Sequence, residues 1–170
     1  MIIYIIISIF IVIVIGFSIF VFLVKLKIEK LENKIKKLFN NRTNLIPSIY
    51  DATKNDFTRH HDIFSEILKY RKIEFSQNDY NENFNVILNT ETKIHNELNF
   101  IFKIMNKHQK LLKKWKIIYL RELIIEKSFE IWKLLKLYRV MVIKYNKLID
   151  IKNYSILWLF IPIEKKENIV

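Results

Sequence analysis

The side chains that most often do chemistry in proteins are few in this chain and poorly spaced for it. There is no Cys, which excludes disulfides, thiolate nucleophiles and Cys-ligated metal sites. Two of the four histidines are the neighbours His60 and His61, and the others, His95 and His108, are isolated in the sequence. None belongs to a His-x-x-x-His or Glu-x-x-His pair of the kind that binds metal in helical bundles. The histidines therefore fit surface positions better than a metal site.

Three carboxylates are the next candidates, because Glu122, Glu126 and Glu130 follow one another at i,i+4 spacing. Side chains at this spacing share one helix face, where two carboxylates could hold a cation. Lys127 and Lys133 lie among them, however, and favour a solvated charged face. No metal site is predicted here.

Several polar residues fall on apolar helix faces, where the core is expected, and Ser128, Arg42 and Arg121 are considered first. Ser128 has no neighbouring His to activate it as a nucleophile, so no catalytic residue and no cofactor site is predicted, and the chain is not expected to be an enzyme. Arg42 and Arg121 are more informative, because a buried charge is costly unless it is paired. Arg42 could pair with a carboxylate of the last helix or with a lipid phosphate. Alternatively its long stem carries the charge out to water, which is the interpretation that we favour.

The element that positions the rest of the chain is an apolar segment near the N-terminus. No charged residue occurs from Ile2 to Val24. At about 1.5 Å per residue, this run is long enough to cross the roughly 30 Å hydrocarbon core of a bilayer. A cleavable signal peptide, cut near Gly16-Phe17-Ser18, is the alternative, but no basic residue precedes the run and apolar sequence continues past that site. We therefore predict a retained transmembrane helix.

Basic residues set the predicted orientation of this helix. All charged side chains, with their formal net charge of +12, come after Val24. The positive-inside rule then places the following domain in the cytoplasm and the N-terminus outside, in a single pass of the cell membrane. Lysines directly behind the span are predicted to contact anionic lipid head groups, at about 1 kcal/mol each, and a solvated stalk without a specific ligand is the alternative. The lysines assigned to this contact are Lys25, Lys27, Lys30 and Lys34.

Beyond the span, apolar residues recur every three or four positions in three stretches, which predicts long amphipathic helices. The first runs from the membrane to about Phe75, with a kink or break at Pro47, and the second begins near Asn81 or Asn83. Segments 76–81 and 103–116 are the predicted reversals. The predicted fold class is all-α: an N-terminal transmembrane helix followed by an antiparallel three- to four-helix bundle. The core positions are Ile28, Leu31, Ile35, Leu38, Leu45, Ile49 and Ala52, then Phe84, Ile87, Glu91, Ile94, Leu98, Ile101 and Met105, then Ile117, Ile124, Ser128, Ile131, Leu135, Tyr138, Val142, Tyr145 and Ile149.

Two apolar segments lack an evident partner in such a bundle. The stripe from Ile28 to Leu38 extends beyond the predicted reach of the second helix, so it could pair with a second copy of the chain as a coiled coil, and homo-oligomerisation is predicted there. The segment Tyr154–Pro162 is too short to span a bilayer. It is expected to pack on the end of the bundle. Membrane contact through Trp158 and Phe160 is the alternative, which a last helix ending far from the anchor would disfavour.

Several positions resemble a known family. The run Asn41–Ile49 contains an arginine, two residues and then Leu-Ile-Pro, which resembles the signature of LemA family proteins, and the last helix and apolar tail resemble that family's closing segments. The resemblance implies a membrane-anchored helical bundle in the bacterial cytoplasm, with no established enzymatic activity and no cofactor. The segment Arg121–Glu130 departs from the family's usual acidic, Gly-containing pattern. The positions carried over as structural motif residues are Arg42, Leu45, Ile46, Pro47, Arg71, Tyr138, Tyr145 and Asn146.

Together these features predict an anchor (residues 1–24), a LemA-like helical bundle (25–152) and an apolar tail (153–170). The bundle is expected to act as a scaffold or interaction surface for an unidentified protein partner, beside anionic lipid. The alternative is nucleic-acid binding near the membrane through the lysine-rich segment 103–121. No recognition fold supports that alternative, which would depend on phosphate contacts alone, so nucleic acid is the less favoured partner.

Overall fold

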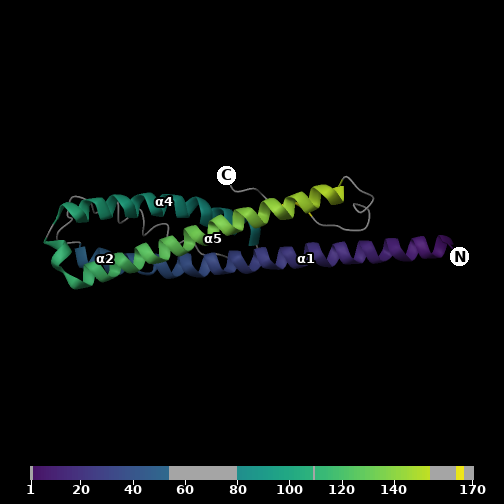
Figure 1. Ribbon diagram of the computed structural model, residues 1–170. Coiled ribbons are helices and arrows are strands. Elements are labelled where there is room, and N and C mark those ends of the chain that lie inside the picture. Colours follow the sequence, from purple (N-terminus) through teal and green to yellow (C-terminus); the bar gives the residue numbers. More distant parts are fainter. Residues whose placement is uncertain (1, 54–79, 109, 154–163, 167–170) are drawn as a thin grey trace. The chain divides into compact units, whose positions relative to one another are not determined.

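The computed structural model describes residues 2–53, 80–108, 110–153 and 164–166. These residues form α1 (Ile2–Thr43), α2 (Ile46–Thr53), α4 (Tyr80–Lys107), the 3₁₀ helix η2 (Leu111–Lys113) and α5 (Trp115–Asn153), as Figure 1 shows. The prediction of an all-α fold is confirmed, since no strand occurs in the described ranges. The chain divides into two compact units: an anchor unit (residues 1–33 and 134–170) and a middle unit (34–133).

The N-terminal part of α1 exposes almost all of its apolar side chains. The helical stretch Ile2–Thr53, which comprises α1 and α2, is long and apolar enough to cross a membrane. Only 6% of its most apolar part is buried within the chain. A helix in the core of a soluble protein would be buried instead. The composition and exposure of α1 thus agree with the predicted span.

The helix break expected at Pro47 is present. α1 ends at Thr43 and α2 begins at Ile46. Between them the Leu45 N–H donates to the Arg42 carbonyl at 3.0 Å, which tightens the last turn. Pro47 falls in the first turn of α2, where the backbone N–H that proline lacks would have had no helical partner. The predicted continuation of this helix to Phe75 lies outside the described residues.

In the anchor unit, α5 returns alongside α1 in the opposite direction. Tyr138 bonds to Glu32, and Tyr145, further along α5, lies near enough to the earlier residue Glu29 to feel its charge. Val21 of α1 is buried in this unit. The expectation that the last helix ends far from the anchor is therefore wrong.

The buried face of α1 is also shifted from the predicted one. Ile28, Ile35 and Ile49 are buried as predicted, but Leu31, Leu38, Leu45 and Ala52 are only half-buried. Their places in the core are taken by the residues one position further on: Glu32, Phe39, Ile46 and Thr53. Because Ile28 and Ile35 are buried within a single chain, the unpartnered stripe that suggested homo-oligomerisation is absent from this part of α1.

The middle unit contains the predicted second helix and the turn after it. Every predicted core position of α4 is buried. The helix begins at Tyr80, ahead of Asn81 and Asn83, so neither asparagine is its N-cap. The predicted reversal before α5 needs no Gly or Pro, because η2 closes it with backbone bonds from Leu111 to the His108 carbonyl and from Lys114 to the Leu111 carbonyl.

Candidate functional site

A buried ion pair joins helices of the middle unit, and we call it with its neighbours the Arg42 cluster. The two terminal nitrogens of Arg42 donate to the two carboxylate oxygens of Glu91 on α4, each at 2.6 Å. One of these nitrogens also lies 3.4 Å from the Ser128 hydroxyl on α5. The guanidinium sits 5.6 Å from the centre of the Phe39 ring. This bidentate geometry is the strongest form of an arginine–carboxylate contact.

The Arg42 side chain is fully enclosed, with an exposed fraction of 0%. The interpretation that it reaches out to water is therefore wrong, and its partner is on α4 instead of on the last helix. The pair could have been found, because Arg42 and Glu91 are opposite charges that both fall on predicted core faces. The Arg42 Nε atom is buried without a hydrogen-bond partner. Such a pair fixes which helix turns face each other more than it adds stability.

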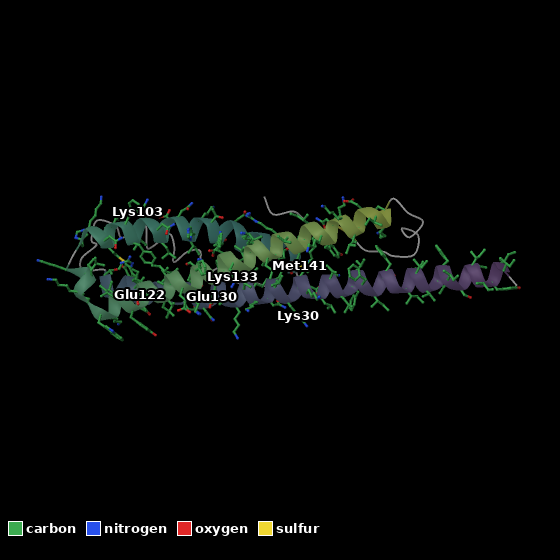
Figure 2. The ribbon with its side chains drawn as sticks, viewed as in Figure 1. Lys30, Lys103, Glu122, Glu130, Lys133 and Met141 are labelled. Carbon is green, nitrogen blue, oxygen red and sulfur yellow. The ribbon has the colours of Figure 1, made fainter. Side chains whose placement is uncertain are left out.

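The other candidates for chemistry are placed as surface or structural groups. The Ser128 hydroxyl donates to the Ile124 carbonyl at 2.8 Å, as helix serines often do. Glu122, Glu130 and Lys133 lie along α5 (Figure 2), and Lys127 bonds to Glu130 at 3.3 Å, which is the main cause that raises the pKa of this lysine. No group of three or more acidic or histidine side chains in the described parts is placed to hold a metal ion.

Arg121, the second charge predicted on a core face, is half-buried on α5. Its guanidinium lies 6.0 Å from the centre of the Phe102 ring of α4, a distance at which a cation and an aromatic face attract each other. Its Nε atom is buried without a hydrogen-bond partner. Arg121 therefore contributes to the contact between α4 and α5.

A second buried polar group, the Glu32 cluster, lies in the anchor unit. Glu32 of α1 is 2% exposed, although the sequence analysis left it outside the core. Its Oε1 atom accepts hydrogen bonds from the Tyr138 hydroxyl at 3.0 Å and from the Lys166 ammonium at 2.5 Å. Its Oε2 atom is buried and has no hydrogen-bond partner in the part of the chain that the structure describes. Glu32 thus connects α1, α5 and the short segment 164–166.

The same segment is held by α5 through its backbone. Asn146 donates from Nδ2 to the Lys166 carbonyl at 2.7 Å and accepts from the Lys166 N–H at 3.0 Å. The Tyr145 hydroxyl donates to the Glu164 carbonyl at 3.2 Å. Lys165 forms an exposed ion pair with Asp150 at 2.5 Å. Segment 164–166 is therefore held through main-chain groups of Glu164 and Lys166 and through the side chains of Lys165 and Lys166.

Replacing Tyr138 with Phe should change how stability depends on pH. Burial, and then the charge and hydrogen bond of Glu32, raise the pKa of Tyr138 far above its usual value of 10.0. As pH rises above about 10, the unfolded state loses this proton while the folded state keeps it, which lowers the free energy of unfolding. We expect a steeper decline for the wild type than for Tyr138→Phe in urea unfolding at several pH values. Parallel declines in the two proteins would contradict this assignment.

The predicted lipid-contacting lysines are mainly on the outer side of α1. Lys27, Lys30 and Lys34 are exposed, and by the helical period they share one side of the helix. Lys30 is labelled on α1 in Figure 2. Lys25 is half-buried and lies 4.0 Å from Glu29. Three of the four therefore form one basic strip.

The residues taken from the family resemblance are scattered over both units. Leu45 and Pro47 are half-buried at the helix break, and Ile46 is buried there. Arg42 belongs to the Arg42 cluster, and Tyr138 bonds to Glu32. The remaining motif positions are Tyr145 and Asn146, which hold segment 164–166, and Arg71, which lies outside the described residues.

An exposed aromatic face, which was not predicted from the sequence, lies on the middle-unit part of α5. Trp115 is 75% exposed and Phe129 is 63% exposed, and three further large apolar residues are exposed with them. Trp115 stacks on Tyr119 at 5.4 Å, and Phe129 on Trp132 at 6.0 Å. The helical period would have placed these residues on one face. The aromatic face comprises Trp115, Tyr119, Ile125, Phe129 and Trp132.

Comparison with known proteins yields no relative. No protein-family model matches the chain, and neither the curated proteins nor the solved structures contain a match.

Proposed function

We propose that the protein is a non-enzymatic, single-pass membrane protein that presents a basic helical domain to a protein partner in the cytoplasm. The exposed apolar part of α1 supports the anchor, and the lysines behind it support the orientation. The resemblance of Arg42, Leu45, Ile46 and Pro47 to the LemA signature favours a LemA-like bacterial scaffold.

The observation that carries this proposal is the aromatic face of α5. Large exposed apolar patches are rare on monomeric proteins and often mark protein contacts. Tryptophan and tyrosine are enriched at the centres of such contacts. By the helical period, charged positions such as Glu122, Glu126 and Lys133 lie on the same side of α5 as these aromatic residues. This mixture suits a partner helix that carries both apolar and charged side chains.

Photo-crosslinking in native membranes tests the proposal. A benzophenone amino acid at position 129 should give a discrete crosslinked species, and the same group at the exposed position His95 on α4 should not. Replacing Tyr119 and Trp132 with Ser should reduce the yield at position 129 at least fivefold, because these residues flank the contact. Equal yields at positions 129 and 95 would contradict the proposal.

If the partner is a second copy of the chain, the crosslinked species will have twice the mass of one chain. Homo-oligomerisation through α1 stays a separate proposal, although Ile28 and Ile35 of the predicted stripe are buried within the chain. Disulfide formation after Leu31→Cys substitution tests it. Absence of a disulfide-linked dimer in native membranes would contradict homo-oligomerisation through α1.

Contact with lipid is part of the same proposal. The basic strip of Lys27, Lys30 and Lys34 directly follows the apolar part of α1, where each lysine gains about 1 kcal/mol from an anionic surface. Replacing these lysines with Gln should therefore lower the preference of the protein for anionic over neutral liposomes.

A second candidate function is binding of single-stranded nucleic acid. Exposed lysines occur at the end of α4, around η2 and at the start of α5, where Trp115 stacks on Tyr119. Phosphate-binding cations beside stacked aromatic rings are the usual elements of such sites. Retention on single-stranded DNA at two salt concentrations, compared with anionic liposomes, separates the two functions. The lysines concerned are Lys103, Lys107, Lys110, Lys113, Lys114 and Lys116.

A further inference from the structure

The contacts of segment 164–166 in the anchor unit have the form of a peptide held in a binding site. Asn146 reads both main-chain groups of a single residue, the N–H and the carbonyl of Lys166. A side-chain amide with one donor and one acceptor in this arrangement recognises extended backbone whatever its sequence. The Tyr145 hydroxyl adds a bond to the carbonyl two residues earlier.

The side-chain specificity of this site comes from Glu32. Its carboxylate is 2% exposed and lies 2.5 Å from the Lys166 ammonium, whose side chain is 11% exposed. By contrast, the neighbouring Lys165 side chain is 50% exposed in its contact with Asp150. An enclosed carboxylate needs an opposite charge, so an uncharged side chain at the Lys166 position would leave Glu32 uncompensated.

The Glu32 carboxylate is satisfied through one of its two oxygens. The Tyr138 hydroxyl and the Lys166 ammonium both bond to Oε1, whereas the buried Oε2 has no hydrogen-bond partner among the described residues. Because that oxygen is enclosed, loss of the Lys166 charge would leave the whole carboxylate without a cation.

We propose that Glu32, Tyr138 and Asn146 form a binding site for an extended peptide that carries a lysine, and that segment 164–166 of the same chain occupies it. The site is a latch that the chain closes on itself and that a lysine-bearing peptide can occupy in its place. The proposal is independent of the aromatic face of α5, which lies in the other unit.

Chemical labelling of the full chain in detergent gives the first test. Lys166 should react with an amine acetylating reagent at least fivefold more slowly than Lys165, because its ammonium is enclosed. Glu32→Gln and Asn146→Ala should each remove this protection, whereas Asp150→Asn, a change at the exposed ion pair, should leave it in place. Equal rates for Lys165 and Lys166 in the wild type would overturn the proposal.

Binding in trans gives the second test. A chain ended after Ile163 should bind a fluorescent peptide with the sequence of residues 164–170, measured by anisotropy. The same peptide with Lys166→Met should bind at least tenfold more weakly, and the matched Lys165→Met peptide should bind as well as the parent. The full chain should bind the parent peptide at least tenfold more weakly than the shortened chain, because its own segment has a high effective concentration at the site.

Circular dichroism of the shortened chain shows whether removal of residues 164–170 changes its helix content. If helix content falls, the parent peptide should restore it and the Lys166→Met peptide should not. Failure of the parent peptide both to bind and to restore helix would show that segment 164–166 is a fixed part of the fold and would overturn the proposal. Crosslinking from the aromatic face would be unaffected by that result.

Discussion

Replacing Arg42 with Met is expected to lower the free energy of unfolding by about 3–5 kcal/mol, because Glu91 would remain enclosed without an opposite charge. The two 2.6 Å bonds between these side chains are the only ones recorded for the Glu91 carboxylate in the described residues. Urea unfolding of the protein in detergent micelles, followed by circular dichroism, measures the change.

The double variant Arg42→Met/Glu91→Met is the matched control. Replacing a whole buried ion pair with apolar side chains is often neutral or stabilising, so the double variant should recover most of the loss. Lys127→Met, which removes a partly exposed ion pair with Glu130, should leave the unfolding midpoint nearly unchanged. A single variant as stable as the wild type would mean that Arg42 is not paired in solution.

Two arginines in the middle of the apolar part of α1 are expected to abolish stable membrane insertion. Val12 and Ile13 are both exposed, so Val12→Arg/Ile13→Arg should leave packing within the chain intact. Each arginine near the centre of a span costs about 2.5–3.5 kcal/mol. We expect the variant to move from the carbonate-resistant membrane fraction to the soluble or aggregated fraction.

Val12→Leu/Ile13→Leu is the matched control and should remain in the membrane fraction, because it preserves the apolar surface. Ile2→Arg, at the end of the span, should also be tolerated, since a long charged side chain there reaches the lipid head groups. Full carbonate resistance of Val12→Arg/Ile13→Arg would show that α1 does not cross the bilayer.

The parts of the fold that follow from apolar spacing were predictable from the sequence. Every predicted position of the stripe from Phe84 to Met105 is buried, and Thr90 and Phe102 are buried beside them. Pro47 marked the break after α1, because a proline is best accommodated in the first turn of a new helix. Both signals depend on residues that are close in the sequence, so they can be read without knowing which helices pack together.

The polar clusters were harder to predict, because their residues look like surface residues until a partner is known. Glu32 was passed over in favour of its apolar neighbour Leu31, yet Glu32 is the buried residue. Its burial depends on Tyr138 and Lys166, which are far away in the sequence. Arg42 differs, because its partner Glu91 was already on a predicted core face and only the pairing between helices was missing.

The antiparallel return of α5 along α1 has a consequence for how the protein is made. Glu32 is separated by 106 residues from Tyr138 and by 134 residues from Lys166, whereas Arg42 is separated by 49 residues from Glu91. Domains form as the chain leaves the ribosome, N-terminal parts first. On our proposal that α1 is a membrane anchor, this helix would therefore enter the membrane long before the helix that covers its buried face exists. We expect the middle unit to fold earlier. The bonds from Tyr138 and Lys166 to Glu32 should form only when almost the whole of this sequence has been synthesised.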